Sequence, residues 1–278
     1  MDTSLFACAQ ETADESARFL SVGKSCPKDT ETAHKRTLVV IPAYNEQDAL
    51  PQTIDSLQSL PANFELLVVN DGSTDDTALV ASRLSTVSLP SLHVISLPLN
   101  GGIGIAVQTG YLFAVQQQRF DYVIQFDGDG QHDTNAIGQL VDTCERYDLD
   151  LCIGSRFLPE SLPGFRSTWL RRFGIRFLAW LISLLGGARV TDPTSGLRCA
   201  GRRAWTIFAT QYPDDYPEPE SLFWCIRNRL RVGEIPAVMH ERFTGASSIH
   251  TLRGAYYMLK VTLAILVDRL RPRECAAG

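Results

Sequence analysis

The stretch Tyr122-Val-Ile-Gln-Phe-Asp-Gly-Asp-Gly-Gln-His132 carries the clearest signal for the fold. Its first five residues form an apolar run that predicts a buried strand, and its last six form an acidic loop with two glycines. On both sides of it, short apolar runs alternate with helical patterns. The expected strands are 37–41, 64–69, 93–97, 122–126 and 151–154, and the expected helices are 47–60, a segment opened by 73–76, 104–118 and 135–147. This alternation predicts an α/β fold with a mainly parallel sheet flanked by helices on both faces.

The acidic loop predicts a divalent cation site. Asp127 and Asp129 flank one small residue, so their carboxylates can face a common ion, and hard oxygen ligands select Mg²⁺ or Mn²⁺. Gly128 lets the backbone approach a ligand closely, and Gln131 can supply a third, neutral oxygen. The alternative is an ordinary Gly/Asp turn between two elements.

Three further loops are expected at the same edge of the sheet, because parallel strands end together and ligands bind beyond their carboxyl ends. In the loop after the first strand, Tyr44 offers a stacking face and Glu46 an acceptor for a ribose or base. Asp71, after the second strand, can accept a base N–H, although its neighbours Ser73 and Thr74 can equally cap a helix. The third loop, Asn100-Gly-Gly-Ile-Gly104, lacks the last glycine of a dinucleotide-binding loop, which argues against a nicotinamide cofactor.

Taken in order, these motifs resemble family 2 glycosyltransferases, which have the GT-A-type nucleotide-diphospho-sugar transferase fold. The resemblance rests on Val-Ile-Pro-Ala-Tyr-Asn-Glu46, Val-Asn-Asp-Gly-Ser-Thr-Asp75, the loop at 100–104 and Asp-Gly-Asp-Gly-Gln-His132. It covers about Leu38 to Ser248, and it is closest to the polyprenol-phosphate mannosyltransferase-like bacterial branch without transmembrane helices.

The resemblance implies a role for each matching residue. Pro42, Tyr44, Glu46 and Asp71 would hold the nucleoside of a UDP- or GDP-sugar, with Gly128 beside it. Asp127 and Asp129 would bridge the diphosphate through Mg²⁺ or Mn²⁺, and Gln131 would stand on the metal side. The ion would neutralise charge on the leaving diphosphate.

The second half of the chain is expected to bind the acceptor. Arg156, in Gly154-Ser-Arg-Phe157, and Arg198, in Thr191-Asp-Pro-Thr-Ser-Gly-Leu-Arg198, match motifs of the same family and could contact phosphate oxygens, or lie on the surface. Arg242 belongs to a loop that in the lipid-phosphate branch folds over the diphosphate. That branch usually has a lysine after the serine, whereas here Ser248 and Ile249 follow Ser247.

An inverting transfer to a hydroxyl requires a base, and the segment before an expected helix at 221–230 is acidic. Glu218 and Glu220 are the candidates, and we favour Glu220 because it stands nearest that helix. Asp214 and Asp215 are alternatives, as is a merely solvated acidic turn.

Two segments have the pattern of apolar or amphipathic helices. The segment 169–185 places an apolar stripe beside Arg171, Arg172 and Arg176, which fits either a membrane interface or a core-packing helix. The segment 256–270 is a second apolar helix that ends in arginines. Both are shorter than the ~20 apolar residues of a bilayer span. We therefore expect a cytoplasmic protein, with peripheral association at the inner face of the membrane as an option.

The composition argues against a nucleic-acid binder and a disulfide-rich protein. The chain has 278 residues with a net charge of −5, and a dedicated nucleic-acid binder would more often be basic. Its seven cysteines form no CxxC, which argues against a disulfide framework or zinc site and suits a reducing cytosol.

We expect a variable N-terminal extension over 1–35, a catalytic domain over 36–250 with a nucleotide-sugar half (36–155) and an acceptor half (156–250), and a C-terminal amphipathic helix and tail over 251–278.

The expected function is a metal-dependent, inverting glycosyltransferase that acts on a glycan or polyprenol-linked acceptor in the synthesis of cell-envelope polysaccharide or glycolipid. Two alternatives stay open. A haloacid-dehalogenase-like phosphatase would use Asp127 in its nucleophile motif, but Gln131 replaces the threonine of that motif. A catalytically inactive nucleotide-sugar binding protein would keep the pocket without the reaction.

Overall fold

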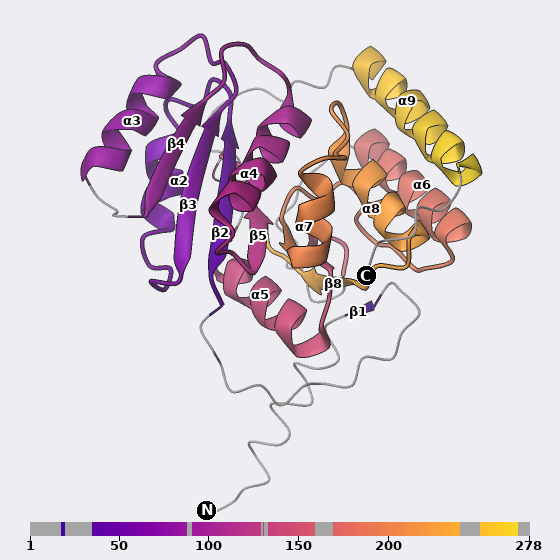
Figure 1. Cartoon of the computed structure of the whole chain (residues 1–278). Helices are drawn as coiled ribbons and strands as arrows, with labels where there is room; N and C mark the ends of the chain where they lie inside the picture. The colour runs from indigo at the N-terminus through magenta and orange to yellow at the C-terminus, as the bar shows by residue number, and fades with distance from the viewer. Residues whose placement is uncertain are drawn as a thin grey trace, which may run out of the picture.

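The computed structural model describes residues 18–19, 35–87, 91–128, 130, 133–158, 169–239 and 251–271. These residues form an eight-stranded sheet in the order β1-β8-β6-β7-β5-β2-β3-β4, with helices on both faces (Figure 1). The strands are β1 (Arg18–Phe19), β2 (Thr37–Ala43), β3 (Phe64–Asn70), β4 (Leu92–Ser96), β5 (Tyr122–Gln125), β6 (Leu151–Ser155), β7 (Arg198–Gly201) and β8 (Val232–Pro236).

The pairing confirms a mainly parallel sheet. Strands β2, β3, β4 and β5 run in parallel, and so do β6 and β8. β7 lies antiparallel between β5 and β6, so β5 and β6 point the same way. The carboxyl ends of β2 to β6 and of β8 therefore meet at one edge, where β7 begins. Residues far apart in sequence converge at this edge.

Two hydrophobic cores sandwich the sheet. Alternate residues of each central strand point to opposite faces: Leu38 and Val40 belong to one core, and Val39 and Ile41 to the other. The helices over the first core are α4 (Ile103–Gln117), α6 (Trp169–Gly186), α7 (Arg202–Phe208), α8 (Pro217–Arg227) and α9 (Thr251–Leu270). Those over the second are α2 (Leu50–Ser56), α3 (Thr77–Val87) and α5 (Asn135–Tyr147).

The expected strands and helices are present, with three corrections. The helix expected over 47–60 is shorter, from Leu50 to Ser56. The helix expected over 221–230 begins at Pro217, because proline is tolerated in the first turn, where its missing N–H is not needed. Glu218 and Glu220 therefore lie on the helix rather than in a turn before it. The sequence analysis also missed β1, β7, β8 and α7.

Buried thiols fit the expectation from the cysteine pattern. Cys144, Cys152, Cys199 and Cys225 are free and buried. Among the described helices, none is long and apolar enough to cross a bilayer.

Candidate active site

The acidic loop starts at the carboxyl edge of the sheet, as expected. Asp127 follows β5 by two residues. The next residue, Gly128, is tied to the first half of the chain: its carbonyl accepts a hydrogen bond from the Thr53 hydroxyl at 3.0 Å, and a side chain on it would lie 3.0 Å from the Pro42 carbonyl. Glycine therefore allows this loop to pack directly on β2.

The rest of the expected metal site lies outside the described residues. This applies to Asp129, Gln131 and His132, so the arrangement of the two aspartates stays a prediction. The part of the chain that the structure does describe contains no cluster of three or more His, Cys, Asp or Glu side chains suited to hold an ion.

On the nucleotide side, Asp71 holds the glycine loop. Its carboxylate is almost fully buried, with 3% exposed, and it accepts hydrogen bonds from the amides of Gly101 and Gly102 at 2.8 and 2.9 Å. Gly102 has φ of 88°, a conformation that favours glycine. Asp71 therefore fixes the backbone ahead of α4, and its expected contact with a nucleoside stays a prediction.

The loops after β2 and β3 are joined by hydrogen bonds. Asn45, at φ of 54°, donates its amide to the Ser73 hydroxyl at 3.0 Å and accepts the Thr74 amide at 2.9 Å. The Glu46 amide donates to the Thr77 hydroxyl at 2.9 Å. Ser73 and Thr74 thus bind the neighbouring loop. This joined pair of loops leaves Tyr44 exposed at the edge of the sheet, as a stacking residue would be.

Glu218, from the acceptor half of the chain, lies near the acidic loop. It sits in the first turn of α8, and its carboxylate accepts a hydrogen bond from the Gln125 side chain at 3.2 Å. Gln125 ends β5 and in turn accepts from the Tyr212 hydroxyl at 3.4 Å. Burial raises the pKa of Glu218, and the negative charge of Asp127 raises it further. The positive charge of Arg198 lowers it, but does not outweigh burial. Glu218 and Asp127 are therefore electrostatic neighbours.

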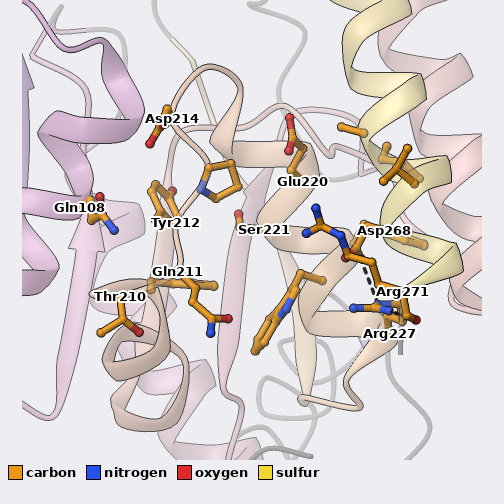
Figure 2. A pocket seen from close by; sticks show the side chains of 17 residues that line it. Gln108, Thr210, Gln211, Tyr212, Asp214, Glu220, Ser221, Arg227, Asp268 and Arg271 are labelled. Carbon is orange, nitrogen blue, oxygen red and sulfur yellow. Dashed lines mark hydrogen bonds and ion pairs between the residues drawn. The ribbon is translucent and has the colours of Figure 1, made fainter. Parts of the chain in front are cut away.

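Glu220 faces a different part of the molecule. It lines a cavity of about 680 Å³ between α8, α9 and the loop before α8, where Asp214 also lies (Figure 2). Burial raises the pKa of Glu220 to about 6, despite the opposing effect of Lys260 on α9. Lys260 itself pairs with Asp215. The structure thus separates the two glutamates: Glu218 turns to the acidic loop and Glu220 to α9.

Arg156 belongs to a buried ion pair. Its guanidinium binds both oxygens of Asp192 at 2.6 and 2.7 Å, and it also reaches the Thr194 hydroxyl at 2.8 Å. Burial alone would lower the pKa of Arg156, but Asp192 outweighs it and the pKa lies above its ordinary value. The fork geometry expected for a phosphate is used here for a carboxylate of the same chain.

Arg198 is also buried, with 1% exposed. It donates to the carbonyls of Ser195 at 2.9 and 3.0 Å and of Glu218 at 3.1 Å. It thereby connects the loop before β7 to the first turn of α8. The surface alternative is wrong for both arginines, and their expected contact with a donor phosphate stays a prediction. Arg242 lies outside the described residues.

A buried carboxyl group, that of Glu234, holds the loop 191–197 in place. Glu234 of β8 is fully buried and accepts the amides of Thr191 and Asp192, each at 3.1 Å. The Thr191 hydroxyl donates to it at 2.7 Å. Burial raises the pKa of Glu234, although these hydrogen bonds oppose the rise. The loop is therefore fixed from β8 and from β6 at once.

This loop ends against Asp127. A side chain on Gly196 would lie 2.6 Å from an Asp127 carboxylate oxygen, closer than atoms can approach. Four carboxyl groups, on Asp127, Asp192, Glu218 and Glu234, share this edge with the two guanidinium groups of Arg156 and Arg198. Of these, Asp192 pairs with Arg156 and Glu234 accepts the loop amides, so both carboxylates serve to position the loop.

Sequence reasoning missed several residues of this site. Glu234 had a signal, because an acid within the apolar run Val232-Gly-Glu-Ile-Pro236 is buried only when it is partnered. Asp192 lies in the motif 191–198, from which only Arg198 was predicted to be a site residue. Gln125 and Gly196 gave no signal, since their importance arises from contacts across the sheet.

Comparison with solved structures agrees with the fold. Glucosyl-3-phosphoglycerate synthase from Mycobacterium tuberculosis, solved with Mn²⁺, UDP and glucosyl-3-phosphoglycerate, matches with a TM-score of 0.62 at 22% identity, over 85% of this chain and 80% of that one. The fold is therefore the GT-A type, and the sheet edge described above is where such transferases are expected to bind their ligands.

Sequence comparisons identify the family. Residues 38–198 match the model of glycosyl transferase family 2. Polyprenol monophosphomannose synthase of Mycolicibacterium smegmatis is 30% identical over 232 residues, which cover 82% of this chain and 86% of that protein. UDP-N-acetylglucosamine–dolichyl-phosphate N-acetylglucosaminyltransferase of Methanococcus voltae is 29% identical over 255 residues, 85% of this chain and all of that protein. The chain belongs to glycosyl transferase family 2. Its class is thus glycosyltransferase, and the phosphatase alternative is excluded.

Proposed function

We propose that this protein is a metal-dependent, inverting glycosyltransferase that moves a sugar from a UDP- or GDP-sugar to a polyprenyl phosphate or another polyprenol-linked or glycan acceptor. The observation that carries the proposal is that Asp127 follows β5 by two residues and that Glu218 accepts a hydrogen bond from Gln125, the last residue of β5, so both acids lie at the carboxyl edge of the sheet. The relatives support the acceptor class, since one is a polyprenol monophosphomannose synthase and the other a dolichyl-phosphate N-acetylglucosaminyltransferase. The product would enter cell-envelope polysaccharide or glycolipid synthesis.

A divalent cation, Mg²⁺ or Mn²⁺, fits the Asp127 carboxylate at the carboxyl edge of the sheet, because hard oxygen ligands suit these ions. Asp127, Asp129 and Gln131 are the residues that would hold it. When bound, the ion would supply positive charge to the leaving diphosphate. Support comes from the likeness to a synthase solved with Mn²⁺ and UDP.

The first half of the chain would hold the nucleotide. Tyr44 would stack on the base and Glu46 would line the pocket, because the joined loops present these two residues together. Pro42, which is buried in β2, would complete the pocket from the end of the strand. Asp71 would act by fixing the glycine loop beneath the nucleotide. Arg242 would reach the diphosphate from the acceptor half. We give Arg156 and Arg198 a positioning role rather than a phosphate contact.

For a hydroxyl acceptor we assign the base to Glu218 and no longer favour Glu220. Glu218 lies beside the acidic loop, and its raised pKa suits a group that accepts a proton near neutral pH. It would take the hydroxyl proton as the acceptor oxygen attacks the sugar carbon from the side opposite the diphosphate. A polyprenyl phosphate already carries an anionic oxygen, so that acceptor would not need the base.

The main test is Asp127→Asn. We expect transfer to fall about a thousandfold or more, because the charge that holds the cation is lost, while the far-ultraviolet circular dichroism spectrum stays unchanged. Asp55→Asn, at an exposed position of α2, is the matched control and should retain full activity. Equal transfer rates in the two variants would disprove the proposal.

The choice of base has its own test. Glu218→Gln should reduce transfer to a glycan hydroxyl about a hundredfold or more and leave donor binding intact. The same variant should transfer to polyprenyl phosphate at nearly the original rate. Glu220→Gln is the control, and a larger loss there than in Glu218→Gln would return the base to Glu220.

We further propose that the enzyme works at the cytoplasmic face of the membrane, with residues 36–250 as one catalytic domain. The support for the domain is that β7 and β8 of the acceptor half alternate with β5 and β6 of the nucleotide half in one sheet.

A further inference from the structure

An apolar surface covers the outer sides of α6 and α9. Of the fifteen large hydrophobic side chains that are exposed in the described part of the chain, ten belong to these two helices. They are Trp169, Phe173, Trp180 and Leu184 on α6, and Tyr256, Leu259, Leu263, Leu266, Val267 and Leu270 on α9. We call these ten residues the α6–α9 face. Exposed apolar side chains scattered singly are normal, but a gathering of this kind marks an interaction site.

The ten side chains form one stripe on each helix. On α6 they recur at spacings of four, seven and four residues, which keeps them on one side of a helix with 3.6 residues per turn. The residues that pack into the core, such as Leu178 and Ile182, lie on the opposite side. On α9 the same holds, with Val261 and Ile265 buried.

The two stripes share one side of the molecule. α6 and α9 pack on each other, with Gly174 against the Met258 side chain, and both pack on α8. Since each helix turns its buried side toward α8, the exposed sides both face away from it. Figure 1 shows the two helices together at the end of the molecule opposite α3.

Positive charge accompanies the apolar stripes. α6 contains Arg171, Arg172 and Arg176, all exposed, and no acidic residue. At the end of α9, Arg269 and Arg271 are exposed, and the helix's one acid, Asp268, pairs with Arg227 of α8 at 3.0 Å. This basic surface belongs to a chain whose net charge is −5.

We propose that the α6–α9 face docks on an anionic lipid surface. Tryptophan and leucine side chains beside arginines match the boundary between acyl chains and negatively charged headgroups. A second copy of this chain fits less well, because a symmetric contact would bring the arginines of the two copies together.

Docking would bring the candidate site close to a lipid-linked acceptor. This consequence of docking rests on the proposed function. α9 contacts the loop before α8: Tyr257 packs on Tyr216 with ring centroids 4.5 Å apart, and Lys260 pairs with Asp215. Glu218 follows this loop directly. The helix that meets the lipid thus also supports the acceptor side of the candidate site.

The test is co-sedimentation of the purified full chain with vesicles of phosphatidylcholine, with and without phosphatidylglycerol. We expect binding to the anionic vesicles. The double variant Leu259→Ser and Leu263→Ser should lower the partition coefficient by about tenfold or more. Leu79→Ser with Leu112→Ser removes two exposed leucines from α3 and α4 and should bind like the original protein.

The charge contribution is tested with Arg172→Glu and Arg176→Glu together. Binding to the anionic vesicles should fall by about tenfold or more, and the weak binding to phosphatidylcholine should not fall. Lack of binding by the original protein, equal losses in the α6–α9 and control variants, or a stable dimer that only the α9 double variant dissociates would each overturn the proposal. Vesicle binding is measured without donor or acceptor, so its result stands whether or not sugar transfer is detected.

Discussion

The nucleotide half and the acceptor half of the candidate site are held together by different forces. In the nucleotide half, loops are tied by backbone amides that donate to side chains, as in Asp71 with Gly101 and Gly102 or Asn45 with Thr74. In the acceptor half, the loop 191–197 is fixed by buried ion pairs and carboxylates, above all Arg156–Asp192.

The two halves should respond differently to single substitutions. A backbone amide that loses its acceptor costs about 1–3 kcal/mol, whereas a buried charge that loses its partner costs about 3–5 kcal/mol. The acceptor half should therefore respond more strongly to single substitutions. It should also be the half whose position relative to Asp127 depends on distant residues.

Asp192→Asn is expected to have the largest effect on stability. It removes the Asp192 charge that pairs with the Arg156 guanidinium, whose side chain is buried with 4% exposed. We expect the free energy of unfolding, measured in urea, to fall by about 3–5 kcal/mol. If the protein fails to fold, the insoluble fraction on expression supports the same conclusion.

The matched control is Asp148→Asn, which breaks an ion pair with Arg231 at the surface. There we expect a loss of less than about 1 kcal/mol, since solvent screens the pair. Asp148 also has φ of 53°, which asparagine adopts readily. Equal losses at the two positions would show that charge burial does not distinguish the acceptor half.

Gly196→Ala should affect activity more than stability. Its new methyl group would lie 2.6 Å from an Asp127 oxygen, so the carboxylate must move. A displacement of about 1 Å can cost about a hundredfold in rate, and we expect a loss of this size in transfer with weaker Mn²⁺ binding.

Gly138→Ala is the control, because nothing lies within 4 Å of a side chain there. It should leave activity unchanged and raise stability by up to about 1 kcal/mol. Unchanged Mn²⁺ binding in Gly196→Ala would contradict the role given to this glycine.

The contrast also explains what the sequence could predict. In the nucleotide half the parallel strands follow one another along the chain, so short motifs at their ends, such as Asn70-Asp-Gly72, showed where its polar residues gather, although the contacts themselves span 29 and 30 positions. In the acceptor half, Glu234 meets Thr191 across 43 positions and Arg156 meets Asp192 across 36. Spacing along the chain carries no information on such pairs, and β7 reverses direction in the sheet without a periodic signal of its own.

Boundaries were harder to predict than elements. The first turn of α8 contains two prolines, Pro217 and Pro219, which resemble a turn in sequence but are accepted at the start of a helix. The misplaced start led to the preference for Glu220. Only the structure shows that Glu218 and Glu220, two positions apart, turn toward different neighbours, as residues at this spacing on a helix do.

Asp71→Asn tests the nucleotide half directly. The asparagine keeps one acceptor oxygen but turns an N–H₂ group toward one of the two glycine amides. We expect a loss of about 1–3 kcal/mol in the free energy of unfolding, less than for Asp192→Asn. The KM for the nucleotide sugar should rise more than kcat falls, because the loop beneath the nucleotide loosens. A larger loss of stability than in Asp192→Asn would reverse the comparison between the halves.

Glu220→Gln should have the smallest effect, and its sign depends on pH. Burial, the main cause, raises the pKa of Glu220 from 4.5 to about 6 in the folded protein. The folded state therefore holds this proton more tightly than the unfolded state, and the original protein loses stability as the pH rises from 4.5 to about 6. Glutamine stays neutral and escapes this loss. The Tm of the variant should exceed that of the original protein above pH 6 and match it below pH 4.5, as differential scanning calorimetry across this range would show. A Tm difference that is constant with pH would mean that Glu220 acts through packing or hydrogen bonding, and not through the penalty on its charge.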